Sequence, residues 1–96
     1  MKSTPPLILV VEDNQQLHLL LRTTLESLNY RVLSATQGEE ALVLARKHQP
    51  NVLILDLGLP DIDGQDLIKR LRKYSEIPII TRCSTLNRLK TRPRLP

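Results

Sequence analysis

The 96-residue sequence contains one cysteine, two tyrosines, and neither tryptophan nor phenylalanine. The lone thiol, Cys83, excludes an internal disulfide framework and favours a reducing compartment, so we expect a cytoplasmic protein. The scarcity of aromatic side chains excludes a stacking platform for single-stranded nucleic acid. No apolar run approaches the roughly 18–20 residues of a membrane-spanning helix, and the first residues lack the apolar core of a signal peptide. These absences favour a soluble domain with no membrane partner.

The composition is that of one small globular domain, with 41% hydrophobic and 25% charged residues. The formal net charge of +4 is unevenly distributed. Residues 1–81 hold nine Lys or Arg and ten Asp or Glu, whereas residues 82–96 hold five Lys or Arg and no acid. We therefore predict a domain at 1–81 and a divergent basic tail at 82–96 that is poorly ordered. Because the positive charge lies in the tail, nucleic-acid binding by this chain alone is not favoured.

Apolar runs alternate with amphipathic segments along the domain. The apolar runs predict strands at residues 7–11, 31–35, 51–56 and 77–81. The amphipathic segments predict helices at about 15–28, at 38–48 and after residue 64. Continuous apolar strands separated by helices are typical of a parallel sheet that is buried on both faces. The order predicts an α/β fold with right-handed crossovers and short connections.

Two helices carry specific expectations about burial. In the first helix, leucines recur at helical spacing, and we expect this stripe to face the core, with His18 at the surface or its boundary. The leucines of this stripe are Leu17, Leu20, Leu21, Leu25 and Leu28. In the third helix, we expect Leu67, Ile68, Leu71 and Tyr74 to point inward.

Acidic residues follow two of the predicted strands. Glu12 and Asp13 end the first strand, and Asp56 ends the third. If these strands are neighbours in a parallel sheet, the three carboxylates meet at its carboxyl edge, where open sheets bind ligands. Crowded carboxylates need a compensating cation, and hard oxygen ligands suit Mg²⁺. We predict a magnesium pocket in which Asp56, standing alone before a glycine-containing loop, is the better nucleophile toward a phosphoryl group.

A family resemblance rests on two runs, LILVVEDN at residues 7–14 and VLILDLGLPDIDG at residues 52–64. They resemble the receiver domain of two-component response regulators, especially regulators with a winged-helix output such as those of potassium-transport operons. The resemblance implies a CheY-like, flavodoxin-like, doubly wound parallel sheet with strand order 2-1-3-4-5. Four strands and three helices are recognisable here. The fifth strand and the last helices are missing or replaced.

The resemblance implies a role for each matching residue. Asp56 matches the phosphoacceptor, which takes its phosphoryl group from a sensor histidine kinase. Glu12 and Asp13 match the acidic pair that holds Mg²⁺ together with Asp56. Gly58 matches the position whose backbone carbonyl binds the same ion, and Gly64, like Pro60, matches residues that shape the following loop. The implied function is that of a non-enzymatic phosphorelay module.

The C-terminal residues depart from the family pattern. The switch serine or threonine is expected near residue 83, where this chain has Cys83 followed by Ser84, so the hydroxyl is absent or displaced. The active-site lysine is expected roughly fifty residues after Asp56, beyond the last residue, and Lys90 has neither its spacing nor the proline that follows it. We therefore expect phosphorelay function to be impaired.

Two other functions stay open. The chain could be a non-phosphorylated interaction remnant that pairs through the exposed edge of the fourth strand and titrates a kinase or a regulator. The same edge could support self-association. A Mg²⁺-dependent phosphatase is least favoured, since no separate acid–base residue or phosphate-cradling loop is visible.

Overall fold

The computed structural model describes residues 4–82, in which strands and helices alternate. The elements are β1 (Leu7–Val11), α1 (Gln15–Ser27), β2 (Arg31–Ala35), α2 (Gly38–His48), β3 (Val52–Asp56), α3 (Gly64–Leu71) and β4 (Ile79–Arg82). The four strands form one parallel sheet in the order β2-β1-β3-β4. The predicted α/β fold is confirmed, and the observed order is the first part of the order 2-1-3-4-5.

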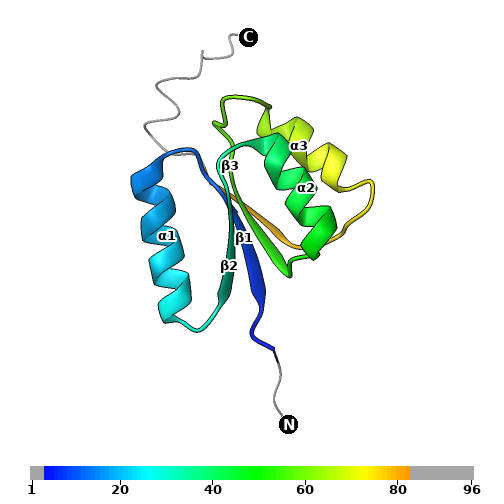
Figure 1. The fold of residues 1–96 in the computed structure, drawn as a ribbon. Coiled ribbons are helices and arrows are strands. Elements are labelled where there is room, and N and C mark those ends of the chain that lie inside the picture. The colour runs from blue at the N-terminus through cyan, green and yellow to red at the C-terminus, as the bar shows by residue number, and fades with distance from the viewer. Residues whose placement is uncertain (1–3, 83–96) are drawn as a thin grey trace.

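The helices cover opposite faces of the sheet (Figure 1). The chain moves outward from β1 to β2 by way of α1, then crosses back over β1 to β3 by way of α2. Because the direction of travel reverses, α1 lies on one face, whereas α2 and α3 lie side by side on the other. The reversal places the carboxyl ends of β1 and β3 side by side, which is where the acidic residues lie.

The core lies between the central strands and the face covered by α2 and α3. Small side chains on α2 let the helix approach the sheet closely, and two buried leucines of α3 complete the layer. The fully buried members are Leu9, Val11, Ala35, Ala41, Leu53, Leu55, Leu67 and Leu71. The inward direction expected for Leu67 and Leu71 is confirmed.

The expectation for Tyr74 is wrong. The third helix ends at Leu71, so Tyr74 lies in the turn after it and is 45% exposed. Its ring instead faces the Arg46 guanidinium, whose central carbon is 5.2 Å from the ring centroid. An amphipathic ring can lie against a cation at the surface without entering the core.

The core stripe expected on the first helix is only partly correct. Leu20 and Leu28 are 61% and 62% exposed, whereas the other three leucines of the stripe are partly buried. The residue that α1 buries is instead His18. Within the described residues, α1 packs mainly on β1 and β2, and this narrow contact buries only one side of the leucine stripe.

The described chain reaches one residue past the expected domain boundary. Arg82, which we had assigned to the tail, is the last residue of β4 and pairs in register with Asp56. The rest of the tail, including Cys83 and Lys90, lies outside the described residues, so its predicted disorder and the missing switch and lysine stay predictions. Among residues 4–82, no helix is long and apolar enough to span a membrane.

Candidate functional site: an acidic pocket at the carboxyl edge of the sheet

Three carboxylates converge where β1 and β3 end. Val11 pairs with Leu55 in the parallel register, so the next residues along the two strands, Glu12 and Asp56, emerge beside each other. One carboxylate oxygen from each of Glu12, Asp13 and Asp56 lies within 4.8 Å of the others. The prediction that the three carboxylates meet at the carboxyl edge of the sheet is confirmed. The chemical role of each acid stays a prediction.

The pocket differs from an ordinary group of surface acids because two of its members are inaccessible to water. Glu12 and Asp56 are fully buried, and Asp13 is partly exposed. The pKa of Glu12 is raised from about 4.5 to about 7. Burial is the largest cause, and the adjacent Asp56 carboxyl adds to the rise, whereas the backbone N–H of Asn14 and the charge of Arg82 oppose it. Ionisation of Glu12 is thus disfavoured near neutral pH.

The main chain around Glu12 is held by hydrogen bonds from neighbouring elements. The Glu12 N–H donates to the Ala35 carbonyl at the end of β2, at 3.0 Å. The Asn14 N–H donates to Glu12 Oε2 at 3.0 Å, while the Asn14 side chain accepts from the Leu17 N–H and caps α1. The same few residues therefore begin the helix and orient the carboxylate.

His18 secures this end of β1 from the first turn of α1. The surface position expected for His18 is wrong, because its ring is buried and Nδ1 lies 3.0 Å from the Glu12 carbonyl oxygen. A carbonyl only accepts, so Nδ1 carries the hydrogen and donates it. Nε2 is buried with no hydrogen-bond partner among the described residues. The helical pattern of leucines concealed this inward-facing histidine.

The loop after β3 holds Asp56 from the other side. The Gly58 N–H donates to Asp56 Oδ1 at 2.9 Å, and the Leu57 N–H donates to the Arg82 carbonyl at 2.9 Å. At Gly64 an added Cβ would lie 2.5 Å from Leu57 Cδ2 and 3.0 Å from Leu57 Cα, so a glycine lets α3 begin against this loop. Metal binding by the Gly58 carbonyl stays a prediction.

Arg82 is a site residue that our sequence reasoning missed. Its Nη1 lies 2.6 Å from Glu12 Oε1, and its side chain is 30% exposed. Had the fourth strand been extended by one residue, its register would have placed position 82 at the same edge as Asp56. Because the basic segment begins at residue 82, we ended the fourth strand at residue 81 and assigned Arg82 to the tail.

Asp61 connects the site loop to the second helix. Its two carboxylate oxygens accept from the N–H groups of Gly38 and Glu39, at 2.8 and 3.0 Å. Burial alone would raise the pKa of Asp61, but these two donors outweigh it and hold the pKa below its usual value. A Cβ at Gly38 would overlap the Ile62 side chain, so the loop and the helix are closely packed.

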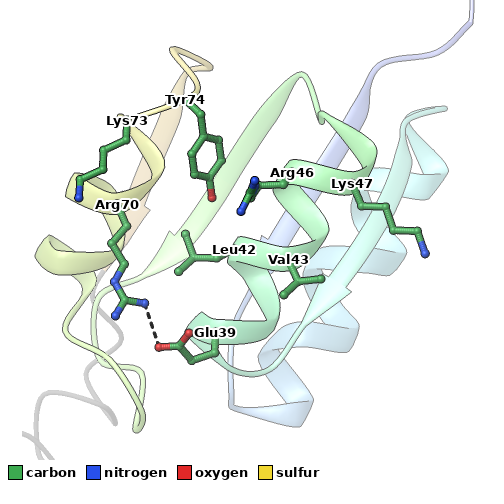
Figure 2. A pocket seen from close by; sticks show the side chains of 8 residues that line it. All are labelled: Glu39, Leu42, Val43, Arg46, Lys47, Arg70, Lys73 and Tyr74. Atoms are coloured by element: carbon green, nitrogen blue, oxygen red, sulfur yellow. Dashed lines mark hydrogen bonds and ion pairs between the residues drawn. The ribbon is translucent and has the colours of Figure 1, made fainter.

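A separate groove lies between α2 and α3 (Figure 2). It has a volume of about 680 Å³, and none of the three pocket acids lines it. Four cationic side chains surround it, namely Arg46, Lys47, Arg70 and Lys73. Arg70 Nη1 donates to Glu39 Oε2 at 3.0 Å across the groove, as the dashed line in Figure 2 shows.

The acidic pocket fits a divalent cation. It offers three carboxylates, which are the hard oxygen ligands that Mg²⁺ prefers. Two of them are buried, and burial together with the neighbouring Asp56 carboxyl raises the pKa of Glu12, so a cation in the pocket would favour the ionised carboxylates. Glu12, Asp13 and Asp56 are the residues that would hold the ion.

Comparisons with known sequences agree with this geometry. The family described as "Response regulator receiver domain" matches residues 8–92. The probable transcriptional regulator ycf27 of Porphyra purpurea is 42% identical over 73 residues, which cover 76% of this chain and 30% of that protein. The KDP operon transcriptional regulatory protein KdpE of Escherichia coli (strain K12) is 44% identical over 73 residues, which cover 76% and 32%. The chain thus spans about a third of the length of these relatives.

Solved structures show the same similarity. The chemotaxis response regulator CheY4 of Vibrio cholerae superposes with a TM-score of 0.77 at 31% identity, over 81% of this chain and 68% of that one. The receiver domain of the Francisella response regulator 1452 superposes with a TM-score of 0.77 at 30% identity, over 88% and 74%. With its parallel sheet, its acidic pocket and these relatives, the chain belongs to the response regulator receiver domain family.

Proposed function

We propose that this chain accepts a phosphoryl group from a sensor histidine kinase on Asp56, in a Mg²⁺-dependent phosphorelay in the cytoplasm. Receiver domains are in general signalling modules that histidine kinases phosphorylate. The observation that carries the proposal is the convergence of Asp56 with Glu12 and Asp13, with one oxygen of each carboxylate within 4.8 Å of the others.

In the proposed transfer, a carboxylate oxygen of Asp56 attacks the phosphorus of the phosphohistidine. An O–P bond forms as the N–P bond breaks, and the electron pair of the broken bond stays on the imidazole nitrogen. The Gly58 N–H donates to Asp56 Oδ1 at 2.9 Å and so restrains the carboxylate. When bound by Glu12, Asp13, Asp56 and the Gly58 carbonyl, Mg²⁺ would neutralise charge on the phosphoryl oxygens.

We further propose that phosphorylation persists weakly while switching is lost. Most of the catalysis of phosphoryl transfer is positioning and electrostatic stabilisation, which the three acids and the ion can supply. The switch hydroxyl is expected near residue 83, where the sequence has Cys83. A phosphorylated protein should therefore fail to signal through the usual switch surface.

The test is incubation with a phosphorylated histidine kinase or with acetyl phosphate, with Mg²⁺ or with EDTA. Label should appear on the wild type with Mg²⁺, and it should be absent from Asp56→Asn and from the EDTA sample. Asp63→Asn is a matched control, because Asp63 caps α3 in the same loop and asparagine preserves the cap. Equal label on Asp56→Asn and the wild type would reject Asp56 as the acceptor.

The second candidate is an interaction module that works without phosphorylation. Among the described residues β4 pairs only with β3, and its Ile80 is exposed. A strand edge of this kind can pair with another chain, either a second copy or a regulator. Binding to a kinase or a regulator that is equal for wild type and Asp56→Asn, but lost in Ile80→Lys, would favour this function over phosphorelay.

A further inference from the structure

Arg82 already contacts the pocket that the proposed magnesium ion would enter. Its Nη1 lies 2.6 Å from Glu12 Oε1, and the carboxylate of Glu12 is fully buried. The other oxygen, Oε2, accepts the Asn14 N–H at 3.0 Å. Both oxygens of Glu12 therefore already accept a donor from the protein, and a metal ion that binds Glu12 enters beside one of these donors.

The position of Arg82 is set by the sheet rather than by chance contact of a long side chain. Its carbonyl accepts the Leu57 N–H at 2.9 Å, and its Cα is paired with that of Asp56 in the parallel register. The side chain thus starts beside Asp56, at the edge of the sheet where the acids lie. Because it remains 30% exposed, the guanidinium has a route to solvent when it leaves Glu12.

We propose that Arg82 is the built-in counter-ion of the acidic pocket, which a divalent cation must displace from Glu12, so that Arg82 sets the metal affinity of the site. The inference rests on the proposed magnesium site and adds a residue to it. A guanidinium and a divalent ion in one pocket repel each other, and both are attracted to the same buried carboxylate. The expected consequence is weak metal binding that depends on residue 82.

The experiment measures Mg²⁺ binding by isothermal titration calorimetry at low salt, with no phosphodonor present. The proteins are the wild type, Arg82→Gln and Arg70→Gln, which removes an arginine from the exposed pair with Glu39. Removing one unit charge beside a divalent ion in a partly buried site should tighten binding by at least about tenfold in Arg82→Gln. Arg70→Gln should bind like the wild type.

Unchanged or weaker Mg²⁺ binding by a folded Arg82→Gln protein, with its fold checked by circular dichroism, would overturn the inference. If that variant does not fold, the wild type decides the question through the side-chain NMR signal of Arg82. The signal should shift as Mg²⁺ saturates the site, and a constant signal during metal binding would overturn the inference. If Arg82→Gln binds Mg²⁺ more tightly as expected but the wild type is not phosphorylated, the proposed function is rejected and the inference about Arg82 stands.

Discussion

Two arginine–glutamate pairs in this protein have the same chemistry and different surroundings. In the acidic pocket Arg82 meets Glu12 at 2.6 Å, and the carboxylate is fully buried. In the groove between α2 and α3, Arg70 meets Glu39 at 3.0 Å, with side chains that are 51% and 61% exposed. Water screens the second pair, so it contributes little to stability. The attraction between Arg82 and Glu12 must offset the free energy lost when the Glu12 carboxylate leaves water. A carboxylate that water does not stabilise is a favourable partner for a cation.

The largest expected effect is the pH dependence of stability without metal. The pKa of Glu12 is raised from about 4.5 to about 7 in the fold, so the folded protein holds this proton more tightly than the unfolded chain. The stabilisation of the fold by protonated Glu12 is fully present below pH 4.5 and is lost as the pH rises through 7. The free energy of unfolding should therefore fall by up to roughly 3 kcal/mol over this range, measured by urea denaturation in EDTA.

Glu12→Gln is the variant that tests this assignment. It preserves the shape of the side chain and an acceptor for the Asn14 N–H, but it removes the titration. Between pH 4.5 and 8 its stability should change less than that of the wild type. If the free energy of unfolding depends on pH in the same way for the two proteins, another group causes the pH dependence. With saturating Mg²⁺ the wild-type loss should disappear, since the metal favours the ionised carboxylate.

The second effect in size concerns metal affinity. Asp13→Ala removes a ligand at the exposed side of the pocket, and Mg²⁺ binding should weaken by at least about tenfold because one of three carboxylates is lost. Glu39→Ala removes an acid of the groove and should leave the dissociation constant unchanged. Both values come from calorimetric titration. Equal weakening in the two variants would mean that general charge, rather than coordination, attracts the ion.

The third effect concerns Asp61, which connects the pocket loop to the helix that borders the groove. Asp61→Ala removes the acceptor of the Gly38 and Glu39 N–H groups, and the free energy of unfolding should fall by about 1 kcal/mol at pH 7. The pKa of Asp61 is lowered, so its contribution is lost as pH falls through the folded pKa. The two proteins should therefore converge in stability at acid pH, and a constant difference would contradict this.

The smallest effect is expected in the groove. Glu39→Gln breaks the exposed pair with Arg70, and the free energy of unfolding should change by less than about 0.5 kcal/mol. Chemical denaturation at low and at high salt measures the change, which salt should reduce further. A larger loss would show that the groove pair is coupled to other contacts, and the contrast with the pocket would then weaken.

Periodicity was enough to predict the α/β class of the fold and the edge of the sheet at which the acids lie, whereas the strand order was implied by the family resemblance. Alternating apolar runs and amphipathic segments imply a parallel sheet, and acids at the ends of β1 and β3 must then share one edge. The errors came from packing at the margins of elements. Tyr74 follows the last turn of α3, and Leu20 lies on the side of α1 that the sheet does not reach. Helical spacing reports which side chains share a face, but it does not report how wide a contact that face makes.

The order of elements, and the position of Glu12, Asp13 and Asp56 at the carboxyl ends of their strands, were determined by sequence alone, because local patterns mark where each strand ends. The tertiary structure made β1 and β3 neighbours and so brought the three acids together. Only the tertiary structure decided that Arg82 belongs to the sheet and pairs with Glu12, residues that are 70 positions apart. Burial, which raises the pKa of Glu12, is likewise a property of the assembled layers. A contact between distant segments depends on the register and the exclusion of water, and neither is visible in the local order of residues.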